Sequence, residues 1–180
     1  QFGCTLIVLA EWKSSIYSGK ELTLVTSNIR RNSPLCLDTK IHHNNLLNNI
    51  LAKIEANHAG VDDAIMLDLN GFVAETNATN IFMIKNGIVY TPFPTACLPG
   101  ITRGLIIELC TEHNIPIIEK DISITELYNS DEVFTTGTMG ELARVVEIDK
   151  RKINNTGSIL SKLQSIFRKL TEKEGECLIF

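Results

Sequence analysis

The chain has 180 residues, a length that suits one domain with a substantial core and is short for two. Hydrophobic residues make up 44% and charged residues 21%, and the formal net charge of −4 argues against a nucleic-acid binder, which usually carries a basic excess. The longest apolar runs, Leu6–Ala10 and Ala64–Leu67, are far shorter than the roughly 20 residues that cross a bilayer, so we expect no membrane span.

The cysteine pattern indicates a reducing, intracellular compartment. The five cysteines are widely spaced and odd in number, which does not suit a disulfide framework: Cys4, Cys36, Cys97, Cys110 and Cys177. The same spacing gives no reason to expect a metal site. The chain opens at Gln1 rather than at a methionine, which leaves room for a targeting segment or an N-terminal domain before it and leaves the cytoplasm and an organelle both open.

Two strands are expected at the beginning of the chain. Thr5–Ala10 and Leu22–Thr26 are apolar and rich in strand-forming residues, and Ser18-Gly19 marks a turn between them. Residues 30–39 are expected to be irregular.

A helix follows, because apolar residues recur at helical spacing: Leu46, Leu47, Ile50, Leu51 and Ile54. Asn44 or Asn45 is expected to cap its start, and Gly60 to end it.

Short strands separated by turns come next. Strands are expected over Ala64–Leu67, Phe72–Ala74, Asn80–Ile84 and Ile88–Tyr90. Leu69-Asn70-Gly71 and Asn86-Gly87 lie between them, and both are hairpin turn signals.

The second half alternates helices and strands. The expected helices and strands, in chain order, are helix Ile101–His113, strand Ile115–Glu119, helix Thr125–Asn129, strands Glu132–Thr136 and Leu142–Ile148, and a closing amphipathic helix Ser158–Leu170. Hairpins rather than regular strand–helix–strand units predict a mixed α+β fold, and a doubly wound parallel sheet is not expected.

Two segments are candidates for binding an anion. In Leu98–Arg103, Gly100 leads directly into a helix, whose first free N–H groups attract an anion such as a phosphate. In Phe134–Glu141, two glycines and three threonines lie between two strands, and backbone amides in such a turn can bind a phosphate or a carboxylate. An ordinary loop-to-helix junction and a plain hairpin turn are the alternatives.

Glu75 is the third candidate. It follows an apolar strand and precedes a small polar turn. A carboxylate in this position either caps a neighbouring amide or serves as the charge partner of a buried cation, which it keeps protonated. The residues alone leave both readings open.

Taken in series, these segments resemble one family. "NNLLNNILAKIEANHAG", "GFVAETNATNIFMIKNGIVYTP", "CLPGITR" and "DEVFTTGTMGE" occur in the order and spacing of the class IV (fold-type-IV) pyridoxal-phosphate aminotransferases, with the branched-chain amino acid aminotransferases most similar. The resemblance covers about residues 10–149. It implies that residues 1–180 form a single domain like the large C-terminal, cofactor-binding domain of the D-amino acid aminotransferase-like fold. That domain has a barrel-like mixed sheet with flanking helices, and the small N-terminal domain would not be part of this chain.

The resemblance also implies roles for particular residues. Glu75 would pair with the protonated pyridine nitrogen of pyridoxal 5'-phosphate, which keeps the ring an electron sink. Leu98 would pack against the ring. The phosphate would be bound at the helix start that follows Gly100, by Ile101 and Thr102, with a hydroxyl from Thr138. The backbone amides of Met139 and Gly140 would face the substrate carboxylate.

By the same resemblance, the reaction is a ping-pong transfer of an amino group between a branched-chain or similar amino acid and a 2-oxo acid, in a homodimer. Those small molecules would be its partners, with neither nucleic acid nor membrane among them. Three alternatives stay open: an aminodeoxychorismate lyase, a D-amino acid aminotransferase, and a non-catalytic homologue that binds the cofactor or a partner protein.

The chain departs from the family at the lysine that binds the cofactor. Members often read "PRIKSLNYLNN" where this chain reads "TKIHHNNLLNN", so His42 stands at the usual lysine position and Leu46 at that of a tyrosine. In one interpretation Lys40 is the Schiff-base residue, because side chains two apart on a strand share a face. In the other, the domain lacks the lysine and cannot run normal transamination, and it either only binds the cofactor or uses His42 as the proton shuttle. Adjacent His42 and His43 would face opposite sides of a strand, so no metal site is expected there.

Overall fold

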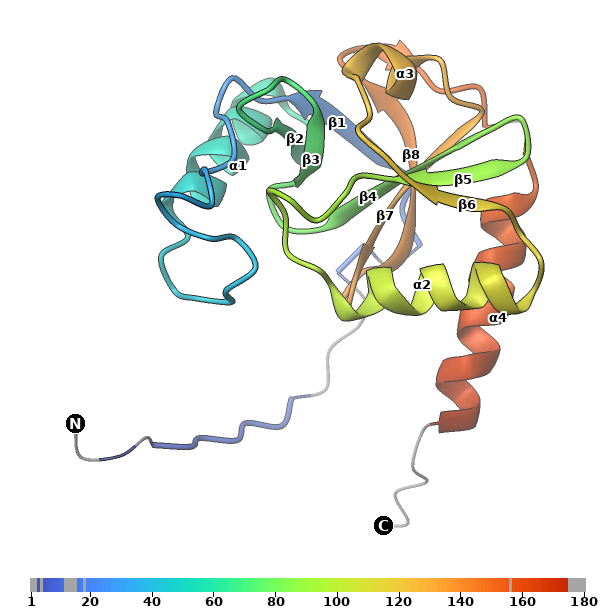
Figure 1. Ribbon diagram of the computed structural model, residues 1–180, viewed down its shortest axis with the longest axis horizontal. Helices are drawn as coiled ribbons and strands as arrows, with labels where there is room; N and C mark the ends of the chain where they lie inside the picture. Colours follow the sequence, from blue (N-terminus) through green and yellow to red (C-terminus); the bar gives the residue numbers. More distant parts are fainter. Residues whose placement is uncertain (1–2, 4, 12–15, 18, 156, 175–180) are drawn as a thin grey trace.

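The computed structural model describes residues 3, 5–11, 16–17, 19–155 and 157–174, which form one curled mixed sheet with helices around it (Figure 1). The strands are β1 (Leu22–Thr26), β2 (Asp63–Leu67), β3 (Val73–Thr76), β4 (Asn80–Lys85), β5 (Ile88–Thr91), β6 (Ile117–Glu119), β7 (Glu132–Gly137), β8 (Glu141–Ile148) and β9 (Arg151–Lys152). The helices are α1 (Leu47–Ala59), α2 (Ile101–Glu112), α3 (Ile124–Tyr128) and α4 (Ile159–Glu174).

The strand order confirms the α+β prediction. It runs β3-β2-β1-β8-β7-β4-β5-β6, with β9 paired to β8. β1 is parallel to both β2 and β8, and β5 is parallel to β6, whereas the β2–β3, β4–β5, β4–β7 and β7–β8 pairs are antiparallel. β3, at one end of the order, also contacts β4, so the sheet curls towards a barrel.

The turn residues of the sequence form the expected hairpins. Gly71, with φ of +88°, lies in the turn between antiparallel β2 and β3. Asn86 and Gly87, with φ of +50° and +79°, connect antiparallel β4 and β5. Positive φ at both central residues is the type I′ geometry that suits the twist of paired strands. The pairing of β9 with β8 was not expected from the sequence.

Three apolar clusters hold the layers together. One lies within the curl of the sheet and includes Leu24, Ile81 and Val133. A second joins the sheet to α2 and α4 through Phe82 and Phe134, whose rings stack with centroids 4.9 Å apart. The third is small and packs α1 on β2. The first two clusters contain large side chains that are fully buried. The part of the sheet formed by β4 and β7 is therefore tightly packed and rigid.

Helix α1 differs from the prediction in two respects. Gly60 ends it as expected, with φ of +70°, but its N-cap is Leu46 without a side-chain hydrogen bond, so the expected cap by Asn44 or Asn45 is wrong. The helix contacts the sheet through Ala52 and Ala56. The apolar residues whose spacing predicted this helix are solvent-exposed. Their exposed fractions are 41–61%, at Leu46, Leu47, Ile50, Leu51 and Ile54.

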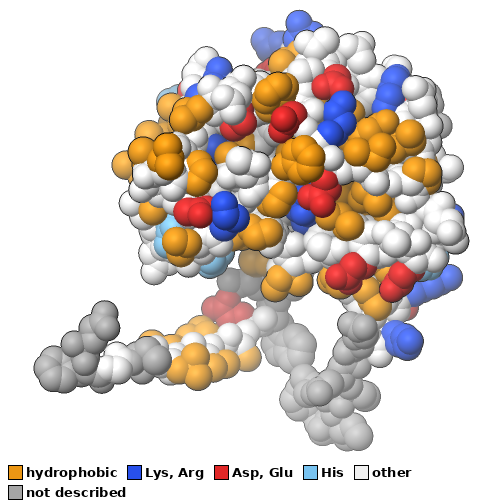
Figure 2. Space-filling model, viewed as in Figure 1, with side chains coloured by type: hydrophobic (Ala, Val, Ile, Leu, Met, Phe, Trp, Pro, Cys, Tyr) orange, Lys and Arg blue, Asp and Glu red, His pale blue; other side chains and the backbone are white. Residues whose placement is uncertain are grey.

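The expected strand Thr5–Ala10 is wrong. These residues are extended but belong to no sheet, and their apolar side chains are exposed, from 75% at Ile7 and Leu9 to 86% at Leu6. Figure 2 shows this apolar segment clear of the body of the molecule, whose visible face mixes charges of both signs. Ser18 of the expected turn lies outside the described residues, and its neighbour Gly19 has φ of +74°.

The described residues contain neither a membrane-spanning helix nor a cluster of metal ligands. None of the helices there is long and apolar enough to cross a membrane. No group of three or more His, Cys, Asp or Glu side chains in that part of the chain could hold a metal ion. Cys36, Cys97 and Cys110 are free thiols, and Cys4 and Cys177 fall outside the described residues.

Candidate functional site

Most of the residues singled out in the sequence line one cavity of about 480 Å³. The predicted site residues in its wall are His42, Glu75, Leu98, Gly100, Ile101, Thr102 and Thr138. The topology brings them together, because Asn80 at the start of β4 pairs with Thr136 at the end of β7, and Glu75 lies at the end of β3. A cavity of this size accommodates a small cofactor.

The start of α2 forms an anion-binding corner of this cavity. Gly100 is the N-cap in an extended conformation (φ −62°, ψ 144°), and no side chain caps the helix. The N–H groups of a first turn have no partner within the helix, so those of Ile101 and Thr102 are available to a ligand. Thr138, from the β7–β8 turn, adds a hydroxyl to the same cavity. A phosphate is the group that such a corner binds best.

Asn80 holds the loop before α2 in place. The Nδ2 of Asn80 donates to the Leu98 carbonyl at 2.8 Å and lies 3.4 Å from Glu75 Oε2. One buried side chain therefore ties the anion corner to the acidic end of the cavity.

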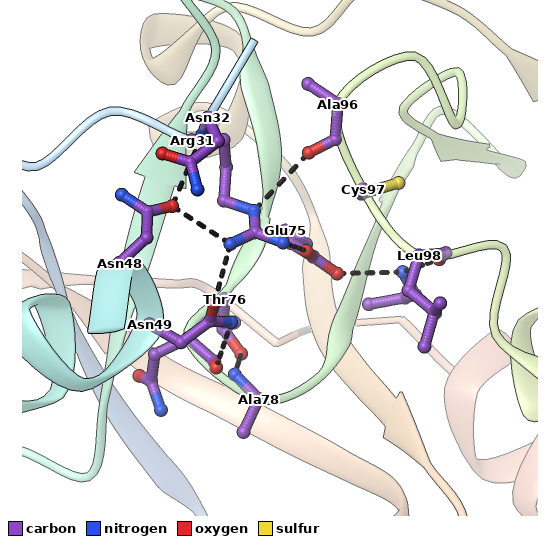
Figure 3. Close-up of polar contacts among 12 residues, drawn as sticks. Arg31, Asn32, Asn48, Asn49, Glu75, Thr76, Ala78, Ala96, Cys97 and Leu98 are labelled. Carbon is purple, nitrogen blue, oxygen red and sulfur yellow. Dashed lines mark hydrogen bonds and ion pairs between the residues drawn. The ribbon is translucent and has the colours of Figure 1, made fainter. Parts of the chain in front are cut away.

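Glu75 is a buried carboxylate with a buried partner. Its Oε1 lies 2.7 Å from Nη2 of Arg31, and only 6–7% of each side chain is exposed (Figure 3). The backbone N–H of Leu98 also donates to Glu75. Burial raises the pKa of Glu75 from 4.5 to about 7, and the Arg31 guanidinium opposes this rise. A carboxylate held in this way is suited to bind a further cation or a protonated ring nitrogen from the cavity side.

The Thr136 hydroxyl is a further indication that the cavity binds a polar ligand. It is buried and has no hydrogen-bond partner among the described residues, and Thr136 lines the cavity. A buried hydroxyl without a partner costs free energy, so a ligand atom that bonds to it gains affinity.

A second cavity of about 270 Å³ adjoins the first and shares His42, Glu75, Ala78 and Leu98 with it. His42 therefore lies at the junction of the two spaces. Thr39, whose hydroxyl is buried and without a partner in the described part of the chain, lines the second cavity.

Lys40 is not brought to either cavity. Its Nζ lies 3.2 Å from Asp38 Oδ1, the side chain is 45% exposed, and Lys40 is absent from the walls of both spaces. His42 is in both walls. Of the two residues considered for the lysine position, the structure thus places the histidine in the site.

Met139 and Gly140 also lie outside the cavity wall. Met139 is 52% exposed, and its carbonyl accepts from the Ile16 N–H. The Gly140 N–H already donates to the Gly137 carbonyl at 3.2 Å, and Gly140 lines a different cavity, next to Tyr17. The Gly140 amide would have to give up this bond to bind a substrate carboxylate.

The chemistry of this donor set fits pyridoxal 5'-phosphate. The anion corner suits its phosphate, the Thr136 hydroxyl lacks a partner, and Glu75 is placed to pair with a ring nitrogen. The fit is incomplete in one respect, because none of the residues that line the two cavities is a lysine.

Three residues of the site were not identified in the sequence: Arg31, Asn80 and Thr136. Asn80 and Thr136 lie within segments that were singled out, at the polar ends of apolar strands, and that position was the available signal. Arg31 lies in an irregular stretch next to Arg30, and nothing local separates the buried arginine from its neighbour.

The comparisons with known proteins agree with this geometry. The family model described as amino-transferase class IV matches residues 4–148. The branched-chain-amino-acid aminotransferase-like protein 2 of Arabidopsis thaliana is 57% identical over 178 residues, which are 97% of this chain and 32% of that protein.

Solved structures have the same fold. A branched-chain aminotransferase from Thermoproteus uzoniensis, solved with norvaline, superposes with a TM-score of 0.86 and 31% identity over 93% of this chain and 56% of that one. An aminotransferase from Brucella abortus bound to the cofactor PLP gives a TM-score of 0.80 and 29% identity, over 85% and 55% of the two chains. This chain thus spans about a third of the plant protein and little more than half of each solved chain. The match over most of its length shows that the chain belongs to the amino-transferase class IV family.

Proposed function

We propose that the protein takes part in pyridoxal-phosphate-dependent transamination, in which a branched-chain or similar amino acid exchanges its amino group with a 2-oxo acid. The observation that carries the proposal is the single cavity shared by Glu75, the start of α2 and Thr138. The names of the relatives, branched-chain aminotransferases among them, favour this substrate class over a D-amino acid or aminodeoxychorismate.

Each part of the cavity would bind a different part of the cofactor. The amides of Ile101 and Thr102 would donate to its phosphate, together with the Thr138 hydroxyl, and Gly100 keeps that corner open to the cavity. Leu98 would pack against the ring. Glu75 would accept a hydrogen bond from the protonated ring nitrogen and hold that proton in place. When bound, the cofactor withdraws electrons from the substrate carbon.

His42 would be the group that moves a proton in this cavity. An imidazole can accept and donate a proton through its ring nitrogens, and His42 lies at the junction of the two spaces. Lys40 stays a candidate for covalent attachment, but its Nζ would have to leave Asp38 and enter the site. Met139 and Gly140 stay candidates for the substrate carboxylate, and the Gly140 N–H would first have to leave the Gly137 carbonyl.

Three broader assignments belong to the same proposal. The chain would be the larger, cofactor-binding domain of the enzyme, and the enzyme a homodimer, which the exposed apolar face of α1 supports. An intracellular, reducing compartment is supported by the free thiols Cys36, Cys97 and Cys110.

Absorbance and chemical trapping test the proposal. Pyridoxal 5'-phosphate is titrated into the protein, the complex is reduced with borohydride, and the modified peptide is mapped. Cofactor binding that Glu75→Gln weakens, with a reduced adduct on Lys40, supports the enzyme. A protein that stays colourless and shows no saturable binding contradicts the cofactor site.

A second candidate function follows from the lysine-free cavity walls. Here the domain binds the cofactor without covalent attachment and does not transaminate. The same experiment separates the two: saturable binding that borohydride leaves fully reversible, with no labelled peptide, favours the non-catalytic homologue.

A further inference from the structure

The guanidinium of Arg31 uses each of its three nitrogens in a hydrogen bond (Figure 3). Nε donates to the Ala96 carbonyl at 3.4 Å, and Nη2 lies 2.7 Å from Glu75. Nη1 donates to the side-chain oxygens of Asn48 at 3.1 Å and Asn49 at 2.8 Å. Arg31 itself is 5% exposed, so this is a desolvated cation with a fixed direction.

The two asparagines can present only their oxygens to Arg31. The Nδ2 of Asn48 donates to the Arg30 carbonyl and that of Asn49 to the Asn77 carbonyl, both at 2.8 Å. These bonds settle the orientation of both side-chain amides. Helix α1, through its first turn, therefore holds Arg31 against the acidic end of the cavity.

Glu75 is held equally on its other side. Its Oε2 faces Asn80 and the Leu98 N–H, so both oxygens are fixed from within the protein. A carboxylate has about four acceptor positions, and the remaining ones are available on the cavity side. Because the site is desolvated, an uncompensated negative charge there would be costly, and the Arg31 cation offsets that cost.

We propose that Arg31 is a positioning residue of the cofactor site, which favours the ionised form of Glu75 and holds it aimed at the cavity, so that the site selects ligands with a protonated aromatic ring nitrogen. The proposal deepens the proposed function and rests on it. Burial alone pulls the pKa of Glu75 upward, and Arg31 is the charged group that opposes it. Among the described residues, the other titratable groups near Glu75 are Cys97, whose thiol is buried with a raised pKa, and His42 in the shared cavity wall.

The first test needs no cofactor. The side-chain carboxyl carbons of glutamate are labelled with ¹³C, and the Glu75 signal, identified by its loss in Glu75→Gln, is followed by NMR against pH. In Arg31→Met the titration midpoint should rise by at least one pH unit, whereas Arg31→Lys should keep most of the wild-type midpoint. An unchanged midpoint in Arg31→Met overturns the proposal.

The second test separates positioning from a merely structural role. Affinity is measured for pyridoxal 5'-phosphate and for its carbocyclic analogue, in which CH replaces the ring nitrogen. Arg31→Met should lose at least tenfold in affinity for the natural cofactor and little for the analogue. Equal losses for both ligands overturn the proposal. Wild-type protein that binds neither ligand contradicts the proposed function, and the NMR titration then still decides whether Arg31 controls the charge of Glu75.

A second variant keeps the proposal testable if Arg31→Met misfolds. Asn49→Ala removes the 2.8 Å hydrogen bond to Arg31 without changing any charge. It should raise the titration midpoint of Glu75 by a smaller amount than Arg31→Met does. It should also weaken binding of the natural cofactor more than binding of the analogue. A change in neither property overturns the proposal even if Arg31→Met cannot be purified.

Discussion

The α-carbon of Gly100 faces the side chain of Asn80 so closely that a Cβ at residue 100 would lie 2.2 Å from Asn80 Oδ1. Real Cβ atoms essentially never approach an oxygen so closely, so any other residue at this position must displace Asn80. Asn80 in turn holds the Leu98 carbonyl at 2.8 Å. The glycine thus lets the loop, the strand β4 and the start of α2 meet at one point.

Gly100→Ala should therefore weaken cofactor binding. Displacing Asn80 breaks its bond to Leu98 and moves the first-turn amides that would bind the phosphate. We expect a loss of about 1–3 kcal/mol in stability, the usual cost of overpacking, and at least a tenfold weaker affinity for pyridoxal 5'-phosphate. Gly104→Ala is the matched control, because the space around Gly104 in the same helix is open and alanine favours a helix. The explanation fails if both variants bind the cofactor as the wild type does.

Glu75 should make the unfolding free energy depend on pH. Its pKa in the folded protein, about 7, is above its ordinary value of 4.5. The folded state therefore keeps this proton longer than the unfolded chain does, and the stability present below pH 4.5 is lost as the pH rises through about 7. The loss is at most about 3 kcal/mol. Urea unfolding at pH 5 and pH 8 measures it.

The matched variant for that experiment is Glu75→Gln, which cannot titrate. Its stability should change less between pH 5 and pH 8 than the stability of the wild type does. Equal pH slopes in the two proteins would show that Glu75 does not titrate in this range.

Local signals predicted much of the fold. Asn86-Gly87 identified the β4–β5 hairpin because both residues adopt positive φ, which few other residues tolerate. Pro99-Gly100 identified the start of α2, because these two residues interrupt regular structure directly before an apolar, helix-forming run. In each case the physical cause lies within a few residues of the signal.

The predictions that were wrong or missing concern contacts between segments, and the local sequence does not determine such contacts. The apolar period of α1 predicted a helix correctly, but periodicity does not say which face meets the sheet, and Ala52 and Ala56 do so. The apolar run Thr5–Ala10 has the composition of a strand but no strand beside it in the described structure. Arg31 and Glu75 lie far apart in the chain, so the sequence around either residue does not predict that the two form an ion pair.

Thr136→Val should separate ligand binding from stability. The Thr136 hydroxyl is buried without a partner in the described structure, so removing it should leave the stability of the cofactor-free protein unchanged or raise it by about 1 kcal/mol. If the hydroxyl bonds to the cofactor, its loss should weaken affinity about fivefold to tenfold.

The neighbouring Thr135 provides the control for that variant. Its hydroxyl is likewise buried without a partner there, but Thr135 is absent from the cavity wall. Thr135→Val should therefore show the same stability effect and an unchanged cofactor affinity. Thermal unfolding and isothermal titration calorimetry of both variants check this, and an equal change in affinity would argue against a ligand contact at Thr136.

The exposed face of α1 should be buried when the protein dimerises. Ile50, at 52% exposure, lies on this apolar face, and groups of exposed apolar side chains mark interaction surfaces. A charge buried in a dimer interface is costly, so Ile50→Glu should convert a dimer into a monomer with no loss of the folded state, as measured by sedimentation velocity and circular dichroism. Leu35→Glu is the control, because Leu35 is 97% exposed and lies away from this helix in the sequence. A wild-type protein that sediments as a monomer at tens of micromolar would contradict the dimer, and an Ile50→Glu variant that stays dimeric would place the interface elsewhere.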